Sequence, residues 1–389
     1  MYRIKTLNKI SQLGLSELDK SCYEISDGVQ NEDGILVRSA DMHEYAFPDT
    51  LRAIARAGAG TNNIPIDRCS EAGIVVFNTP GANANAVKEL AICALLMASR
   101  NVPAGAAWVR AQVDADIDVE TVVEKGKSQF AGPELAGKTL GVVGLGAIGV
   151  LVANIATKLG MTVYGYDPYL SVEAALSMSR AINRALDLET IYRNCDYITI
   201  HVPQTKETKG MICNETFGIM KDGVRIINLA RGGLVNDDDM LCALESGKVA
   251  AYVTDFPNNK IAAGKNVVLM PHLGASTPES EENCAVMAAQ ELRAYLEDGD
   301  IRNSVNLPNL VQPWSTGYRV CIIHRNVPGC IAQVTGKLSG LNVNVENMTN
   351  KSKGDYAYTV VDVSAHIEES VVNELCAIEN VLHVRALSR

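Results

Sequence analysis

Aromatic residues are scarce in this chain, and its cysteines are not paired. Only 5% of the 389 residues are Phe, Trp or Tyr, whereas 47% are hydrophobic and 31 are glycines. This balance is typical of parallel α/β proteins, whose buried strands are rich in Val, Ile and Leu. The ten cysteines stand singly, without a Cys-x-x-Cys pair or the spacing of a metal site. We therefore expect reduced core cysteines, no metal and a cytoplasmic protein.

An excess of positive charge and long apolar runs are also lacking. The formal net charge is −10 and the isoelectric point is near 5.2, which argues against a nucleic-acid surface and against binding to anionic membranes. No apolar run is long enough to cross a bilayer, and we expect no signal peptide. An anionic substrate would therefore need a local cluster of positive charge.

A dinucleotide-binding motif is the most informative feature that is present. The segment Thr139–Gly149 reads as a strand, a glycine turn and the start of a helix, and Asp167 ends the next apolar strand. Gly144 permits the tight turn, Gly146 permits close approach of a pyrophosphate, and Gly149 permits the helix to lie close to the sheet. Asp167 can accept hydrogen bonds from ribose hydroxyls and repels a 2′-phosphate, so NAD is favoured over NADP.

Short apolar strands alternate with helical segments along most of the chain, which is the pattern of doubly wound parallel sheets. A helix after the dinucleotide half can cross back to the N-terminal part. We predict a Rossmann-type doubly wound parallel sheet domain, residues 89–270, inserted in a flavodoxin-like substrate-binding domain made of residues 1–88 and 271–310. Residues 318–389 then read as strand, helix, two strands, helix and strand, which predicts a C-terminal ferredoxin-like module.

Further motifs follow one another in a fixed order, namely Arg56–Asn63, Asn78–Val87, Asn228–Gly233 and Pro271–Ser276. With the glycine turn, they resemble the D-isomer-specific 2-hydroxyacid dehydrogenases over nearly the whole chain. The C-terminal module is similar to the ACT domain of regulated members. The resemblance implies an NAD-dependent dehydrogenase for a phosphorylated 2-hydroxy acid, oxidising 3-phospho-D-glycerate to 3-phosphohydroxypyruvate in the first step of L-serine biosynthesis. It also implies a homodimer or homotetramer.

Two other functions stay open at this point. One is a related dehydrogenase that acts on glyoxylate or hydroxypyruvate. The other is a binding protein without turnover, like the corepressors that share this fold and sense NAD(H). The ACT-like tail and the acidic composition favour the enzyme.

Two residues are candidates for the chemistry of hydride transfer from a 2-hydroxy acid. His272 follows a strand, where the active sites of α/β proteins gather, and histidine exchanges protons near neutral pH. Arg231 follows another strand, and its planar fork can hold a carboxylate by two contacts while it polarises the C2 oxygen. We therefore expect a base at His272 and a carboxylate clamp at Arg231.

The chain departs from the resemblance beside its catalytic histidine. Members of the family carry a glutamate that supports this histidine, whereas here Asn259 occupies the matching position. An amide can orient an imidazole, but it cannot stabilise an imidazolium by charge. A shifted register, in which Asp255 helps instead, stays open. The aspartate that contacts nicotinamide in the family falls on Thr254 or Asp255, and we favour Asp255 because a carboxylate accepts from a carboxamide.

The resemblance also implies substrate, cofactor and effector contacts. The expected substrate contacts, besides Arg231 and His272, are Arg38, Ser39, Arg56, Ala59, Gly60 and Asn83, and the phosphate could instead meet Lys125 or Lys127. The expected cofactor contacts, besides the glycine turn, Asp167 and Asp255, are Ala147, Ile148, His201, Val202, Pro203, Thr208, Ala230, Gly274 and Ala275. In the ACT-like module, His324, Asn326 and Asn342 match residues that bind L-serine in regulated relatives.

Overall fold

The chain forms two compact units, one of which is inserted into the other. The computed structural model describes all residues from Met1 to Arg389. One unit comprises Met1–Asn83 and Pro278–Arg389, and the second comprises Ala84–Thr277. The chain therefore changes unit a few residues away from the expected boundaries at 88/89 and 270/271, and the assignment of the units to substrate and cofactor stays a prediction.

The first unit begins with a parallel five-stranded sheet in the order β2-β1-β3-β4-β5. This order and its covering helices are those of flavodoxin-like folds. Every residue of the central strand β3 is buried, as expected for a strand covered on both faces. The elements are β1 (Tyr2–Leu7), α1 (Gln12–Leu15), β2 (Tyr23–Ser26), β3 (Gly34–Val37), β4 (Ala53–Arg56), α2 (Ile66–Glu71), β5 (Val75–Phe77) and α11 (Pro278–Asp298).

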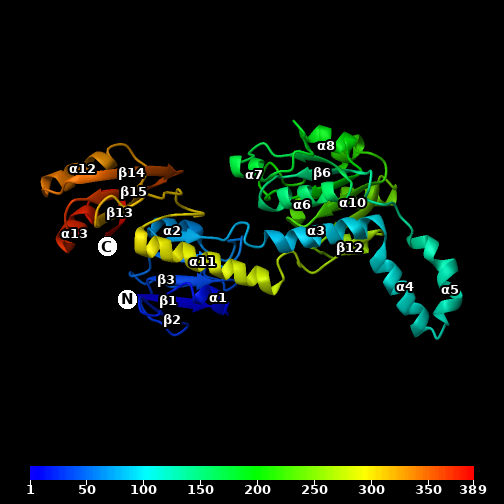
Figure 1. The fold of residues 1–389 in the computed structure, drawn as a ribbon, viewed down its shortest axis with the longest axis horizontal. Helices are drawn as coiled ribbons and strands as arrows, with labels where there is room; N and C mark the ends of the chain where they lie inside the picture. Colours follow the sequence, from blue (N-terminus) through cyan, green and yellow to red (C-terminus); the bar gives the residue numbers. More distant parts are fainter. The chain divides into compact units, whose positions relative to one another are not determined.

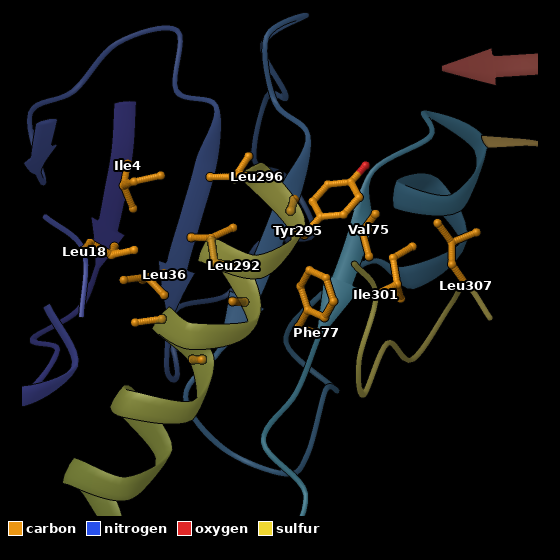
Figure 2. Packing of buried hydrophobic residues seen from close by; sticks show 14 of the residues in the cluster. Ile4, Leu18, Leu36, Val75, Phe77, Leu292, Tyr295, Leu296, Ile301 and Leu307 are labelled. Atoms are coloured by element: carbon orange, nitrogen blue, oxygen red, sulfur yellow. The ribbon is translucent and has the colours of Figure 1, made fainter. Parts of the chain in front are cut away.

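Helix α11 returns from the inserted unit and covers one face of this sheet. Figure 2 shows Leu292 and Leu296 of α11 facing Ile4 and Leu36 on neighbouring strands. The contact with α1 is close, because a Cβ on Gly14 would lie 2.5 Å from the backbone of Ala285. The sheet thus depends for its core on a helix far along the chain.

The second unit is a parallel seven-stranded sheet in the order β12-β11-β10-β9-β6-β7-β8. Counted from β6, this is the strand order 3-2-1-4-5-6 of the Rossmann fold with one more strand. The strands are β6 (Thr139–Val143), β7 (Thr162–Tyr166), β8 (Ile182–Arg184), β9 (Tyr197–Ile200), β10 (Val224–Asn228), β11 (Val249–Thr254) and β12 (Val267–Leu269). The helices are α3 (Ala84–Ser99), α4 (Val102–Asp114), α5 (Val119–Gly126), α6 (Ala147–Lys158), α7 (Val172–Ser177), α8 (Leu188–Asn194), α9 (Asn214–Ile219) and α10 (Asp237–Glu245).

Helices α4 and α5 extend away from the sheet of the second unit (Figure 1). Neither contains a buried residue, whereas α3 packs alanines and Leu95 into the hydrophobic core of the second unit. No single helix is long and apolar enough to cross a membrane, although α3 and α4 together, bent by 66°, pass on length and composition.

The C-terminal residues form an antiparallel four-stranded sheet in the order β14-β15-β13-β16. This is the strand order of ferredoxin-like folds, so the expected fold class is confirmed in all three parts. The elements are β13 (Tyr318–Arg325), α12 (Cys330–Gly340), β14 (Val345–Lys353), β15 (Tyr356–Val363), α13 (Glu369–Cys376) and β16 (Val381–Ser388).

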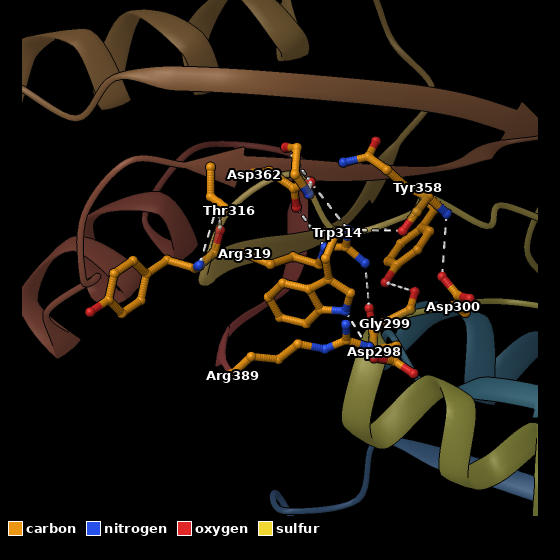
Figure 3. A network of polar contacts seen from close by, with 12 residues as sticks. Asp298, Gly299, Asp300, Trp314, Thr316, Arg319, Tyr358, Asp362 and Arg389 are labelled. Atoms are coloured by element: carbon orange, nitrogen blue, oxygen red, sulfur yellow. Dashed lines mark hydrogen bonds and ion pairs between the residues drawn. The ribbon is translucent and has the colours of Figure 1, made fainter.

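The ACT-like module shares a core with the rest of the first unit. One face of its sheet packs under α12 and α13, while Cys321, Ile323, Tyr358 and Val360 of the other face belong to the core that contains α11. Figure 3 shows the polar contacts at this junction, where Tyr358 donates to the carbonyl oxygen of Gly299 at 2.6 Å. The module is therefore joined to the first unit by buried apolar and polar contacts.

A buried ion pair completes the junction. The guanidinium of Arg319 donates to Asp362 at 2.6 Å, and both side chains have no exposed surface. Arg319 also donates to the carbonyl oxygens of Asp298 and Gln312, each at 2.8 Å. Burial alone would raise the pKa of Asp362, but the hydrogen bonds from Arg319 and Ser315 hold it below its ordinary value. The pair is therefore charged and fully hydrogen-bonded.

Candidate active site

The glycine turn after β6 has the geometry that its sequence predicts. Gly144 adopts a left-handed φ of 91°, and a Cβ there would lie 2.6 Å from the carbonyl oxygen of His201. A Cβ on Gly149 would lie 1.9 Å from the carbonyl oxygen of Gly144. Both positions therefore exclude any larger residue, and α6 lies directly against the turn.

The outer side of the same turn is open. A Cβ on Gly146 would meet no atom within 4 Å, and no side chain caps the N-terminus of α6. Asp167, after β7, accepts hydrogen bonds from the N–H of Leu145 and of Tyr169, both at 2.8 Å. An open glycine, an uncapped helix N-terminus and a carboxylate held beside them fit the pyrophosphate and ribose of a dinucleotide.

The segment after β9 forms a second wall of the turn. His201 shares a hydrogen bond of 3.0 Å with the hydroxyl of Thr199, and burial lowers its pKa to about 4, so the ring is neutral at neutral pH. The hydroxyl of Thr208 donates to the carbonyl oxygen of Pro203 at 2.7 Å. These residues, with Val202, lie where the sequence predicts the adenine side, and their contact with a cofactor stays a prediction.

Arg231 is presented by a short turn that a buried asparagine holds. Asn228 ends β10 and is fully buried. Its amide donates to the carbonyl oxygen of Arg231 at 2.9 Å, and its Oδ1 accepts from the N–H of Ala230 at 3.2 Å. The Arg231 guanidinium is exposed and makes no ion pair; its one hydrogen bond goes to the carbonyl oxygen of Ala230 at 2.7 Å. It is thus free to receive a carboxylate.

His272 lies in an unusual backbone conformation beside β11. Its φ is 50°, and its N–H donates to the carbonyl oxygen of Asp255 at 2.9 Å. The ring is exposed and lies against Phe256, with the two ring centres 4.7 Å apart. The imidazole makes no hydrogen bond within the chain, so both nitrogens are available to a substrate.

Asp255 is the carboxylate of this site. It is 1% exposed, its Oδ2 accepts from the N–H of Gly274 at 3.0 Å, and its Oδ1 has no hydrogen-bond partner. Burial raises its pKa, against the opposing effects of the Gly274 N–H and of the charges of His272 and Arg231. The structure therefore brings Arg231, His272 and Asp255 together at the carboxyl edge of the second sheet.

Asn259, the expected substitute for a glutamate, is exposed and makes no hydrogen bond to His272. Its neighbour Asn258 shapes this loop instead, since its Oδ1 accepts from the N–H groups of Lys260 and Ile261. Support of His272 by Asn259 stays a prediction. Asp255 is the acidic residue that is hydrogen-bonded to the histidine, through its backbone carbonyl oxygen.

In the first unit, two arginines lie at the carboxyl ends of neighbouring strands, Arg56 as the last residue of β4 and Arg38 directly after β3. Arg56 is the last residue of β4 and pairs in register with Val37, directly before Arg38. The turn at Ser39 is held by Asn8, whose Oδ1 accepts from the N–H groups of Ser39 and Ala40 at 2.9 and 2.7 Å. Sequence reasoning missed Asn8, whose only local signal is an asparagine that follows a strand.

Asn63 is a second supporting residue that sequence reasoning did not identify. It accepts from Nε of Arg56 at 3.0 Å and donates to the carbonyl oxygen of Ala40 at 2.8 Å. Asn78 donates to the carbonyl oxygen of Ala59 at 2.6 Å, directly before Gly60. The chain thus fixes the backbone around the expected substrate residues, while Asn83 makes no side-chain hydrogen bond.

The remaining expected residues lie in or just after α5 and in the ACT-like module. Lys125 is in α5, and Lys127, just after it, pairs with Glu124. In the ACT-like module, His324 is 2% exposed, and its ring nitrogens contact the carbonyl oxygen of Arg325 at 2.8 Å and the hydroxyl of Thr359 at 2.9 Å. Asn326 donates to the carbonyl oxygen of Gly354 at 3.1 Å, and Asn342 follows α12 with a φ of 57°. Their role as an effector site stays a prediction.

The comparisons with known proteins agree with this geometry. Residues 92–274 match the NAD-binding domain of the D-isomer-specific 2-hydroxyacid dehydrogenases. The chain is 34% identical over 330 residues to a D-3-phosphoglycerate dehydrogenase of Bacillus subtilis, covering 80% of this chain and 60% of that protein. It is 32% identical over 378 residues to one of Mycobacterium bovis, covering 90% of this chain and 68% of that protein. The chain belongs to the D-isomer-specific 2-hydroxyacid dehydrogenase family.

A solved structure of this dehydrogenase family supports the fold. The NAD⁺-bound 3-phosphoglycerate dehydrogenase of Entamoeba histolytica is 27% identical, with a TM-score of 0.61, and the match covers 79% of this chain and 99% of that one. The family resemblance expected from the motifs is thus confirmed, and residues 92–274 are an NAD-binding domain. The chain spans only about three fifths of the length of the Bacillus subtilis relative.

Proposed function

We propose that this chain catalyses the NAD-dependent oxidation of 3-phospho-D-glycerate to 3-phosphohydroxypyruvate, the first step of L-serine biosynthesis. The observation that carries the proposal is the grouping of Arg231, His272 and Asp255 at the carboxyl edge of a sheet whose first strand ends in the dinucleotide turn. The relatives named D-3-phosphoglycerate dehydrogenase support the choice of substrate.

The three residues of this edge divide the chemistry between them. When bound, NAD supplies the acceptor for the hydride that leaves C2 of the substrate. The free imidazole of His272 takes the proton of the C2 hydroxyl, and it returns that proton in the reverse direction. Arg231 holds the C1 carboxylate by its planar fork and polarises the C2 oxygen. The negative charge of Asp255 stabilises the imidazolium that forms.

The cofactor contacts follow from the groups that the chain leaves open. Oδ1 of Asp255, which has no partner, is the acceptor for the carboxamide of nicotinamide. The N–H groups of Ala147 and Ile148, at the uncapped start of α6, receive the pyrophosphate. Asp167 accepts from the ribose hydroxyls, as its place after β7 favours for NAD. Ala230 would contact the nicotinamide ribose region, and Gly274 and Ala275 would also contact the cofactor.

A phosphorylated substrate requires additional cations, and the first unit supplies them. Arg38 and Arg56 stand at the carboxyl ends of neighbouring strands, on backbone that Asn8 and Asn63 hold in place. We assign the phosphate to these two arginines.

The proposal also covers the location of the protein, its oligomeric state and its effector. All ten cysteines are free, as expected in the cytoplasm. The enzyme works there as a homodimer or homotetramer, and L-serine binds the ACT-like module as an effector.

The test is NADH oxidation with 3-phosphohydroxypyruvate, run beside glyoxylate and hydroxypyruvate, with L-serine in half of the wells. We expect the phosphorylated substrate to have the highest kcat/KM and His272→Asn to lower kcat by a factor on the order of 100 or more. Turnover of glyoxylate without turnover of the phosphorylated substrate would replace the proposal with a reductase. NADH binding without turnover of any substrate would replace it with a sensor.

A further inference from the structure

Arg38, one of the two cations assigned to the phosphate, is already paired with an acid of the chain. Its Nη2 lies 2.7 Å from Oε1 of Glu281, in the first turn of α11. Both side chains are partly open to solvent, with 41% of Arg38 and 47% of Glu281 exposed. A carboxylate of the protein thus occupies a position on the guanidinium that an anionic substrate would use.

The ion pair between Arg38 and Glu281 is not needed to hold the loop that follows β3. The backbone after β3 is held by Asn8 and Asn63 through four hydrogen bonds, none of which involves the side chain of Arg38 or of Glu281. A partly exposed pair of this kind contributes little to stability because water screens its charges, so a ligand can displace it.

The surroundings of Glu281 are those of an anion site. Cys284, one turn further along α11, is buried, which raises the pKa of its thiol, while the charges of Arg38 and Arg56 act in the opposite direction. This side of α11 therefore faces both arginines. The carboxylate of Glu281 therefore reduces the positive charge that an incoming phosphate meets at Arg38.

We propose that Glu281 competes with the phosphate group of the substrate for Arg38 and so sets the affinity of this site for phosphate. The inference rests on the proposed function, since it takes the ligand of Arg38 to be a phosphate monoester. A dianionic phosphate held by both arginines displaces the carboxylate, whereas a weaker anion meets an arginine that is already neutralised. Glu281 therefore lowers the affinity of the site for an anion that uses Arg38.

The experiment compares wild type with Glu281→Gln, with Glu279→Gln as the matched control. Glu279 lies in the same turn of α11, is exposed and has no ion pair. We expect Glu281→Gln to lower KM for 3-phosphohydroxypyruvate about two- to fivefold, with kcat within about twofold of wild type. KM for glyoxylate, which has no phosphate, stays unchanged in both variants, and Glu279→Gln behaves as wild type.

Binding of inorganic phosphate, measured by calorimetry, provides a readout that does not depend on turnover. We expect Glu281→Gln to bind phosphate more tightly by a similar factor, and Arg38→Gln/Glu281→Gln to lose this gain. Unchanged or weaker phosphate binding by a folded Glu281→Gln variant would overturn the inference and make Glu281 a residue that orients Arg38. Failure of wild type to turn over 3-phosphohydroxypyruvate would refute the proposed function instead, and the phosphate titration would still decide the role of Glu281.

Discussion

The side-chain amide of Asn228 and the carbonyl oxygen of Arg231 are joined by a hydrogen bond of 2.9 Å. Because Asn228 is fully buried at the end of β10, it fixes the turn that presents the arginine. We expect Asn228→Ala to lower kcat/KM by a factor on the order of 100 through misplacement of Arg231. Asn258→Ala, which loosens a loop without touching Arg231, serves as the control. Wild-type kcat/KM in a folded Asn228→Ala variant would contradict the assignment.

Asp255 and Asn259 are the two candidates for the residue that supports His272 during the reaction. In the proposed mechanism the charge of Asp255 stabilises the imidazolium, so we expect Asp255→Asn to lower kcat by a factor on the order of 10 to 100. Asn259 makes no hydrogen bond to His272, so Asn259→Ala should keep the kcat of wild type. Steady-state kinetics in both directions is the measurement, and a larger loss of kcat in Asn259→Ala than in Asp255→Asn would contradict the choice of Asp255.

Substitutions at the two glycines near the start of α6 are expected to affect different properties, namely stability at Gly149 and cofactor binding at Gly146. A Cβ at Gly149 would overlap the carbonyl oxygen of Gly144, whereas a Cβ at Gly146 would meet open space. We expect Gly149→Ala to destabilise the protein by about 1–3 kcal/mol or more. Gly146→Ala should keep wild-type stability but bind NADH at least about tenfold more weakly. Thermal unfolding and NADH fluorescence titration measure the two effects, and equal NADH affinity in Gly146→Ala would remove this glycine from the pyrophosphate site.

Glu291, on the inner side of α11, makes stability depend on pH. It is 5% exposed, its Oε1 accepts from Asn303 at 2.7 Å, and burial raises its pKa to about 8. A carboxyl whose pKa is higher in the folded than in the unfolded state stabilises the fold fully at low pH. That contribution is lost as the pH rises from about 4.5 toward 8, because only the unfolded state releases its proton freely.

We therefore expect Glu291→Gln to match wild type near pH 4.5 and to exceed its unfolding free energy by up to roughly 4 kcal/mol near pH 8. Urea unfolding of both proteins across this range is the measurement. A difference that does not grow with pH would show that Glu291 is ionised in the folded chain.

The buried pair between Arg319 and Asp362 should be more sensitive to the loss of one partner than of both. Asp362→Ala leaves a buried guanidinium without its counterion, at a cost of about 3–5 kcal/mol. The double variant Arg319→Met/Asp362→Leu should lose less, because neither charge remains buried. Denaturant unfolding of the full chain compares them, and a double variant less stable than Asp362→Ala would show that the backbone contacts of Arg319 matter more than the charge.

Elements with strong periodicity could be predicted from the sequence. Strand β15 (Tyr356–Val363) is one of the strands expected in the C-terminal module; seven of its eight residues are buried and apolar residues dominate it. Other strands have a weak sequence pattern. Strand β8 has three residues, of which only Ile182 is buried, and β14 continues to Lys353 through polar, exposed residues. Such segments join a sheet through backbone hydrogen bonds, which leave little trace in residue type.

The site shows the same division. The glycine turn, Arg231 and His272 could be proposed from the sequence because the expected chemistry needs particular residue types at the ends of strands. The supporting asparagines could not, since Asn8 and Asn63 act through backbone groups far along the chain. The pairing of Arg38 with Glu281 joins residues from the two separate chain segments of the first unit, and nothing in the local sequence of either indicates the other.

The interrupted course of the chain also sets an order for synthesis. Strands β1 to β5 leave the ribosome long before α11, which closes the core around Ile4, Leu36 and Leu292. The inserted unit contains all seven strands of its own sheet and can finish folding during that interval. While the inserted unit is being synthesised, the N-terminal sheet is therefore a nascent half-domain with an exposed apolar face, and it is the part of this chain that we expect to bind a chaperone.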